Sequence, residues 1–297
     1  MSNAEPPPPS PARDYADAER RFEVLRERDG PRVSSAGRSR FYAHGRRTPL
    51  GIVLVHGFTN CPQQWDMFSK QLHACGHTVV VPRLPGHGHF NRSTRAPARH
   101  PAADLLGCVS EAVDVACGAA AQVVLAGLSI GGAIAVSIAL GRDDVSHTIA
   151  IVPFFAPGRS DVAGTRLLTR GLERLPNFFV PWDPAGDGSQ IPSYAYPKFS
   201  TRMLAECLRI ALWVETASQE RAPSGKTTFL LNAHEPACNN DVARLVCGRF
   251  AEHRARSAEA IVLDDLPANH DIVDPTNPQA RVDLVYPVLR RLIEATA

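Results

Sequence analysis

The sequence predicts an α/β fold in which a mostly parallel central sheet is flanked by helices. Short continuous apolar runs, typical of strands buried on both faces of a parallel sheet, alternate with longer segments of helical spacing. The chain has 297 residues, of which 44% are hydrophobic, which is sufficient for a sizeable core in one domain with an insertion. A serine flanked by glycines separates one strand from one helix, and loops at such strand ends are where open α/β sheets bind ligands.

The chain begins with a proline-rich segment, residues 1–13, which we expect to be a disordered tail before a single domain at residues 14–297. A charged helix at 14–28 ends at Asp29-Gly30-Pro31. Apolar runs predict further strands at 38–44, 50–55, 78–81, 123–126, 147–152, 226–231 and 260–263. Helical spacing predicts helices at 62–74, 102–117, 133–140, 162–175, 201–218, about 240–253 and about 277–295.

One segment, residues 153–223, interrupts this alternation. It is rich in proline and aromatic residues and has helical pieces but no strong strand. Long connections in compact domains usually carry function. We therefore expect a helical lid over the carboxyl edge of the sheet, and the alternative is an ordinary helix with long connections.

The stretch around which the chain is organised is 122–133, Gln-Val-Val-Leu-Ala-Gly-Leu-Ser-Ile-Gly-Gly-Ala. It contains a Gly-x-Ser-x-Gly motif centred on Ser129, between the strand at 123–126 and the helix at 133–140. This is the setting of a nucleophile elbow, a strained turn that exposes a serine hydroxyl at the top of a sheet. The alternative is a glycine-rich turn with an incidental serine.

The flanking glycines and the helix start have predicted roles in the same motif. Gly127 and Gly131 must lack side chains because neighbouring backbone passes close by. The backbone N–H of Ile130 lies at the start of the helix, where it can help to hold a developing oxyanion.

A second oxyanion donor is predicted where the strand at 50–55 runs into His56-Gly57-Phe58-Thr59-Asn60. We assign this role to the backbone N–H of Phe58. His56 is a possible catalytic base, but we interpret it as a residue that shapes the loop. A base that precedes the nucleophile in the chain belongs to a different fold order.

The order of serine, then acid, then histidine indicates a catalytic triad. A serine hydroxyl needs an imidazole to take its proton, and a carboxylate must fix the imidazole tautomer. His270, in a loop beyond the last strand, is the predicted base, with His234 as the alternative. Glu235, four residues beyond the strand at 226–231, is the predicted acid. The alternatives for the acid are Asp241, which also suits a helix cap, and Asp264 or Asp265.

Charge and cysteine content exclude several classes of function. The net charge of +2 gives no indication of a nucleic-acid partner. The seven cysteines form no Cys-x-x-Cys pair, and His77, His87 and His89 have no adjacent carboxylate or cysteine, so we expect no metal and no cofactor. Reduced thiols and the lack of a signal-peptide core predict a cytoplasmic protein. No apolar run is long enough to span a membrane.

In combination, these motifs resemble those of α/β-hydrolases, especially bacterial carboxylesterases and monoacylglycerol lipases. The matching stretches, within residues 38–295, are His56-Gly57-Phe58-Thr59, Pro82-Arg83-Leu84-Pro85-Gly86-His87-Gly88, Gly127-Leu128-Ser129-Ile130-Gly131-Gly132 and His270-Asp271-Ile272-Val273-Asp274-Pro275. The resemblance implies Ser129 as nucleophile, His270 as base, and Phe58 and Ile130 as oxyanion donors. Members of the family usually carry Asp followed three positions later by an apolar residue, where this chain has Glu235 and Cys238.

The predicted function is hydrolysis of a small carboxylic ester with an apolar acyl or alcohol part, through an acyl-enzyme on Ser129. The aromatic, proline-rich segment indicates a hydrophobic pocket. The alternatives are a thioesterase or carbon–carbon bond hydrolase with the same triad, and a non-catalytic binding protein on this scaffold. The sequence predicts no particular oligomeric state.

Overall fold

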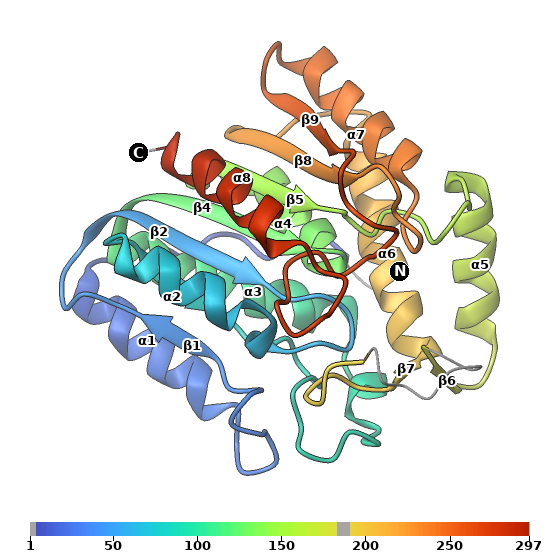
Figure 1. The fold of residues 1–297 in the computed structure, drawn as a ribbon, viewed down its shortest axis with the longest axis horizontal. Coiled ribbons are helices and arrows are strands. Elements are labelled where there is room, and N and C mark those ends of the chain that lie inside the picture. The colour runs from blue at the N-terminus through green and yellow to red at the C-terminus, as the bar shows by residue number, and fades with distance from the viewer. Residues whose placement is uncertain (1–3, 183–190, 297) are drawn as a thin grey trace.

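The computed structural model describes residues 4–182 and 191–296 and confirms the predicted fold class. Its centre is a seven-stranded sheet with the strand order β1-β3-β2-β4-β5-β8-β9 (Figure 1). Among the strands that the structure describes in this sheet, β1 and β3 form the only antiparallel pair, at one edge. The strands of the sheet are β1 (Arg40–Tyr42), β2 (Thr48–Val55), β3 (Thr78–Val81), β4 (Ala120–Leu128), β5 (His147–Ile151), β8 (Lys226–Asn232) and β9 (Ala258–Leu263).

Helices cover both faces of the sheet and bury one hydrophobic cluster on each. One face carries α1 (Tyr15–Glu27), α3 (Ala102–Ala119), α4 (Ile130–Leu140), α6 (Thr201–Ala217) and α7 (Asn240–His253), and the other carries α2 (Asp66–Ala74) and α8 (Val282–Glu294). Short 3₁₀ turns lie at Pro62–Trp65 and Ala96–Arg99. No helix in the described ranges is both long and apolar enough to cross a membrane.

The strand order reverses between β2 and β4, and this reversal fixes the place of the site. The chain adds β3 and β1 on one side of β2, and β5, β8 and β9 beyond β4. β2 and β4 run parallel with Val55 opposite Gly127, so the loops that follow these strands emerge side by side. Ligands of open α/β sheets bind at the carboxyl ends of the strands where the order reverses.

The segment at 153–223 has two structurally different parts. α6 packs against α3 and α4, and its buried face belongs to the main core. α5 (Val162–Arg174) packs on the outside of α6, and β6 (Phe179–Pro181) pairs with β7 (Lys198–Ser200) away from the main sheet (Figure 1). The sequence did not predict this two-stranded ribbon, because its strands are three residues long and show no alternation. Whether the outer part acts as a lid stays a prediction.

The N-terminal segment also differs from its prediction. Within residues 4–13, the Ala12 side chain is buried, and the Ser10 and Ala12 N–H groups donate to the Asp114 carboxylate and carbonyl at 3.1 and 2.9 Å. Ala12 lies against Gly118 of α3, where a Cβ would come within 2.7 Å of the alanine methyl group. Because Gly118 has no side chain, the N-terminal segment can pack closely against α3 at this position. The proline-rich composition of the segment does not indicate this contact.

Candidate active site

Ser129 lies in the strained turn between β4 and α4. Its backbone has φ 59° and ψ −119°, in the region with positive φ that residues other than glycine rarely adopt. Two backbone hydrogen bonds hold it there: the Ser129 N–H donates to the Ile151 carbonyl at 2.9 Å, and the Phe154 N–H donates to the Ser129 carbonyl at 3.0 Å. The end of β5 thus maintains the strain.

The two flanking glycines are required by close backbone contacts. A Cβ on Gly127 would collide with the Gly131 carbonyl, and a Cβ on Gly131 would collide with the Val55 carbonyl. Neither collision can be relieved by a side-chain rotation, because both partners are backbone atoms. The turn, α4 and the end of β2 therefore pack together only with glycine at both positions.

The loop after β2 lies directly beside the serine. A Cβ built on Gly57 would be 3.7 Å from Ser129 Cβ, so the Gly57–Phe58 peptide borders the nucleophile. Ile130 is the first residue of α4, where a backbone N–H has no carbonyl partner within the helix. One predicted oxyanion donor, the N–H of Phe58, therefore belongs to the loop that lies beside Ser129. The other, the N–H of Ile130, belongs to the residue that directly follows Ser129 in the chain.

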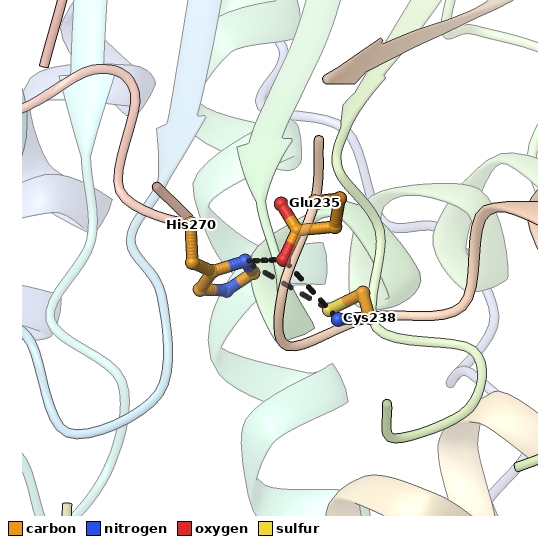
Figure 2. Close-up of side chains that lie close together, drawn as sticks. All are labelled: Glu235, Cys238 and His270. Carbon is orange, nitrogen blue, oxygen red and sulfur yellow. Dashed lines mark hydrogen bonds and ion pairs between the residues drawn. The ribbon is translucent and has the colours of Figure 1, made fainter. Parts of the chain in front are cut away.

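The predicted acid and base are in direct contact (Figure 2). Nδ1 of His270 donates to Glu235 Oε1 at 2.8 Å, and the Glu235 side chain has no exposed surface. The same oxygen accepts the Ala237 and Cys238 N–H groups at 2.8 and 3.2 Å. Oε2 has no hydrogen-bond partner in the described part of the chain. The carboxylate is therefore held by one oxygen, in the orientation that directs His270.

Electrostatics at this pair favour the protonated imidazole. Burial disfavours the imidazolium, but Cys238 and the Glu235 carboxylate outweigh burial and raise the pKa of His270 well above its ordinary value. Burial raises the pKa of Cys238, against the effects of His270 and Ser129. Because the thiol is then neutral near pH 7, we attribute the stabilisation of the imidazolium mainly to Glu235.

The alternative acids lie elsewhere. Asp241 is 89% exposed and pairs with Arg244 at 3.1 Å. Asp264 and Asp265 are exposed and border a surface hollow that includes neither Ser129 nor His270. The cap of α7 is Asn239, whose side chain accepts the Asp241 N–H, so Asp241 is not the helix cap that the sequence suggests.

The alternative histidines are also placed away from Ser129 or committed to other contacts. His234 is exposed and borders the same hollow as Asp264. His56 is fully buried, and its Nε2 accepts the Leu84 N–H at 3.1 Å. Burial, together with His87, holds the pKa of His56 well below its ordinary value. A neutral His56 thus joins the loops after β2 and β3.

A side-chain bridge that sequence reasoning missed connects the serine side of the site to the histidine loop. The Gly57 N–H donates to Gln64 Oε1 at 2.8 Å, and Gln64 Nε2 donates to Asp271 Oδ2 at 2.7 Å. Asn60 Nδ2 donates to the same Asp271 oxygen at 3.3 Å. Burial and neighbouring Asp274 raise the pKa of Asp271 to about 6. No motif spacing indicates Gln64, because its partner is more than two hundred residues away in sequence.

Asn232, at the end of β8, is a second residue that sequence reasoning missed. Its side-chain amide donates to the carbonyls of Pro267 and Asn269, both at 2.9 Å. This places the loop that carries His270 against the loop that carries Glu235. The residue is fully buried, so each of these bonds is protected from water.

Ser129 and His270 border one cavity of about 160 Å³. Its wall is made of apolar and polar residues, which include Phe58, Trp182, Pro192, Tyr196, Asn60 and Asp271. Within the described ranges, no hydrogen bond joins the Ser129 hydroxyl to His270. Contacts of this kind commonly tighten only when substrate binds.

In the described ranges, one group of three residues has the composition and spacing of metal ligands: Glu235, Cys238 and His270. Their ligand atoms all lie within 4.8 Å of one another. The histidines at 77, 87 and 89 form no such group. His87 is buried, and its Nδ1 lies 3.0 Å from the Pro85 carbonyl.

Comparisons with known proteins support the fold. The sequence matches the family described as alpha/beta hydrolase over residues 52–284. It is 27% identical over 180 residues to a thermostable monoacylglycerol lipase of Bacillus sp. (strain H-257), covering 59% of this chain and 66% of that protein, just under two thirds of its length.

Solved structures with similar folds include one from work on two metagenome-derived lipolytic enzymes. It has a TM-score of 0.70 at 17% identity and covers 89% of this chain and 99% of that one. A monoglyceride lipase from Saccharomyces cerevisiae has a TM-score of 0.69 at 11% identity, over 88% and 92% of the two chains. At these identities the likeness concerns the fold alone. The family match covers most of the chain, and the chain therefore belongs to the alpha/beta hydrolase family.

Proposed function

We propose that the protein hydrolyses carboxylic esters through an acyl-enzyme on Ser129. The observation that carries the proposal is the strained turn that presents Ser129 to the same cavity as His270. Nδ1 of His270 is bonded to the buried carboxylate of Glu235. Such an arrangement leaves Nε2 of His270 free to accept a proton. The monoacylglycerol lipase to which the sequence is similar supports an ester as the substrate.

In this mechanism, Nε2 of His270 takes the proton of the Ser129 hydroxyl as the oxygen attacks the ester carbonyl. The Glu235 carboxylate keeps the proton on Nδ1 and stabilises the imidazolium that forms. The backbone N–H groups of Phe58 and Ile130 hold the negative oxygen of the tetrahedral intermediate. His270 then gives its proton to the leaving alcohol, and water releases the acyl group by the same steps in reverse order.

The surroundings of the cavity favour an ester with an apolar part of moderate size. Phe58 is in aromatic contact with Trp182 and Phe199, with ring centroids 5.7 and 5.9 Å apart. The Trp182 indole N–H donates to Thr59 Oγ1 at 2.7 Å, which connects the residue directly after β6 to the loop after β2. We infer that this outer part of the 153–223 segment acts as a lid and limits acyl length.

The finer assignments are part of the same proposal. A reducing, cytoplasmic location suits the seven cysteines, all of which are unpaired. A thioesterase or a carbon–carbon bond hydrolase would use the same groups, and a binding protein would use the cavity without the chemistry. The experiment below separates the binding protein from the catalytic alternatives.

The experiment measures hydrolysis of p-nitrophenyl esters from acetate to palmitate, with Ser129→Ala as the control. We expect turnover that Ser129→Ala abolishes while its thermal unfolding midpoint stays near that of the wild type. A covalent adduct of an organophosphonate on Ser129 would support catalysis independently of substrate choice. Turnover that survives in Ser129→Ala would contradict the proposal, and absence of both turnover and labelling would favour a binding protein.

A further inference from the structure

Three side chains beside the nucleophile together offer the donor set of a zinc-type metal site. Glu235 supplies a carboxylate oxygen, Cys238 a sulfur and His270 a ring nitrogen (Figure 2). Sulfur, imidazole nitrogen and carboxylate oxygen are the three ligand types that bind Zn²⁺ in proteins.

The distances suit an ion of this size. His270 Nδ1 lies 2.8 Å from Glu235 Oε1 and 3.9 Å from Cys238 Sγ, and all three atoms fall within 4.8 Å of one another. Metal–ligand bonds of roughly 2.0 to 2.3 Å place tetrahedral ligand atoms about 3.3 to 3.6 Å apart. The nitrogen and oxygen therefore need to separate by only about 0.5 Å, and the sulfur needs to approach by a similar amount.

The charges of the three groups also suit a divalent ion. Cys238 is 4% exposed and the Glu235 side chain is fully buried, so an ion here would be desolvated. One thiolate and one carboxylate neutralise a charge of +2, which removes most of the cost of burying the ion. Glu235 Oε2 has no hydrogen-bond partner in the described ranges, so a rotation of the carboxylate toward the ion breaks no bond at that atom.

We propose that Glu235, Cys238 and His270 form an inhibitory site for Zn²⁺ and similar divalent ions. The inference about inhibition rests on the proposed function, whereas the inference about binding does not. The Ser129 hydroxyl or a water molecule takes the fourth position. The exposed edge of His270, whose side chain is 27% exposed, provides the way in from the cavity.

Inhibition follows from where the protons go. In the form that acts as a base, the imidazole is neutral, its proton lies on Nδ1 and is bonded to Glu235, and Nε2 is free. An ion on Nδ1 requires that proton to move to Nε2, and the Cys238 thiol loses its proton to solvent. Nε2 then has no lone pair for the Ser129 proton, so the base is lost without any oxidation or reduction. This ion is an inhibitor and takes no part in the reaction.

Binding is tested without reference to activity by titrating the protein with Co²⁺, which reports thiolate ligation as a charge-transfer band in the near ultraviolet. We expect the band in the wild type and in Cys75→Ser, which removes an exposed cysteine outside the site. We expect it to be lost in Cys238→Val, and in Cys238→Ser as a second variant in case valine disturbs folding. An equal band in wild type and both Cys238 variants would overturn the proposal.

Inhibition is tested by adding Zn²⁺ to the ester assay and reversing it with a chelator. We expect the Zn²⁺ concentration for half-inhibition, measured against each variant's own rate, to rise about a hundredfold in Cys238→Val. Equal inhibition of wild type and Cys238→Val would contradict the site. A cobalt–thiolate band in a protein without Ser129-dependent turnover would instead contradict the proposed function and leave the metal site standing.

Discussion

The assignment of Glu235 as the catalytic acid is tested most directly by Glu235→Gln. The amide is isosteric with the carboxylate, and its oxygen can still accept the two backbone N–H groups of Ala237 and Cys238 and the proton on His270 Nδ1. The substitution therefore removes the negative charge while the geometry is retained. The amide NH₂ takes the place of Oε2, which has no partner in the described ranges, so we expect a modest loss of stability as well.

The size of the effect follows from the distance between the charges. With Nδ1 and Oε1 2.8 Å apart, the centres of charge of the imidazolium and carboxylate are separated by about 4 Å. At an effective dielectric constant of about 20, their attraction is about 4 kcal/mol. If the transition state carries a full imidazolium, kcat falls by about a thousandfold, since each 1.36 kcal/mol changes a rate about tenfold.

The assay is steady-state hydrolysis of the best p-nitrophenyl ester, with circular dichroism to compare the folds. Asp241→Asn is the matched control, because Asp241 is an acid in the same part of the chain that is 89% exposed. We expect the kcat of this variant to stay within about twofold of the wild-type value. A Glu235→Gln enzyme that keeps more than a tenth of the wild-type kcat would refute the assignment. A large loss in Asp241→Asn would show that the acid was wrongly chosen.

Four further outcomes are expected. Gln64→Leu breaks the bridge to the Gly57–Phe58 peptide, so kcat should fall about tenfold to a hundredfold while KM stays nearly constant, and an equal change in KM would contradict the bridge as a positioning element. Because His270 acts as a base only when neutral and its pKa is raised, kcat/KM should increase with pH through that raised pKa, and the rise should move to lower pH in Glu235→Gln. Arg83→Met leaves the buried Asp29 carboxylate without its ion pair and should lower the free energy of unfolding by about 3 to 5 kcal/mol in urea titrations, whereas Arg281→Met, in an exposed pair, should leave the midpoint unchanged. Trp182→Ala should shift the preferred acyl length in the ester series, and an unchanged preference would count against a lid.

Much of the fold could be predicted from the sequence because its signals are local. An apolar run such as 50–55 has to be buried on both faces, and the turn at Gly127 to Gly131 has to lack side chains whatever surrounds it. The positions of Ser129 and His270 relative to their strands follow from the same local patterns. Boundaries were less certain: the last helix begins at Val282, about five residues later than predicted, because residues before it form turns.

Contacts between distant segments had no such signal. The choice of Glu235 among four candidate acids depends on which carboxylate reaches His270, and the structure places Glu235 at 2.8 Å and Asp241 in solvent. Three-residue strands such as Phe179–Pro181 are defined only by their partner. The same holds for the docked N-terminal segment, which depends on a gap left by Gly118.

Local patterns were sufficient to predict the strands, their order along the chain and the strand ends that carry the serine and histidine, because backbone sterics and hydrophobic periodicity act over a few residues. Three features depend instead on how distant segments pack: which acid directs His270, that Gln64 connects Gly57 to Asp271, and that Cys238 lies 3.9 Å from the imidazole. Hydrogen bonds and metal ligation depend on distances of a few ångströms between side chains. Those distances are fixed when strands from distant parts of the chain pair in one sheet.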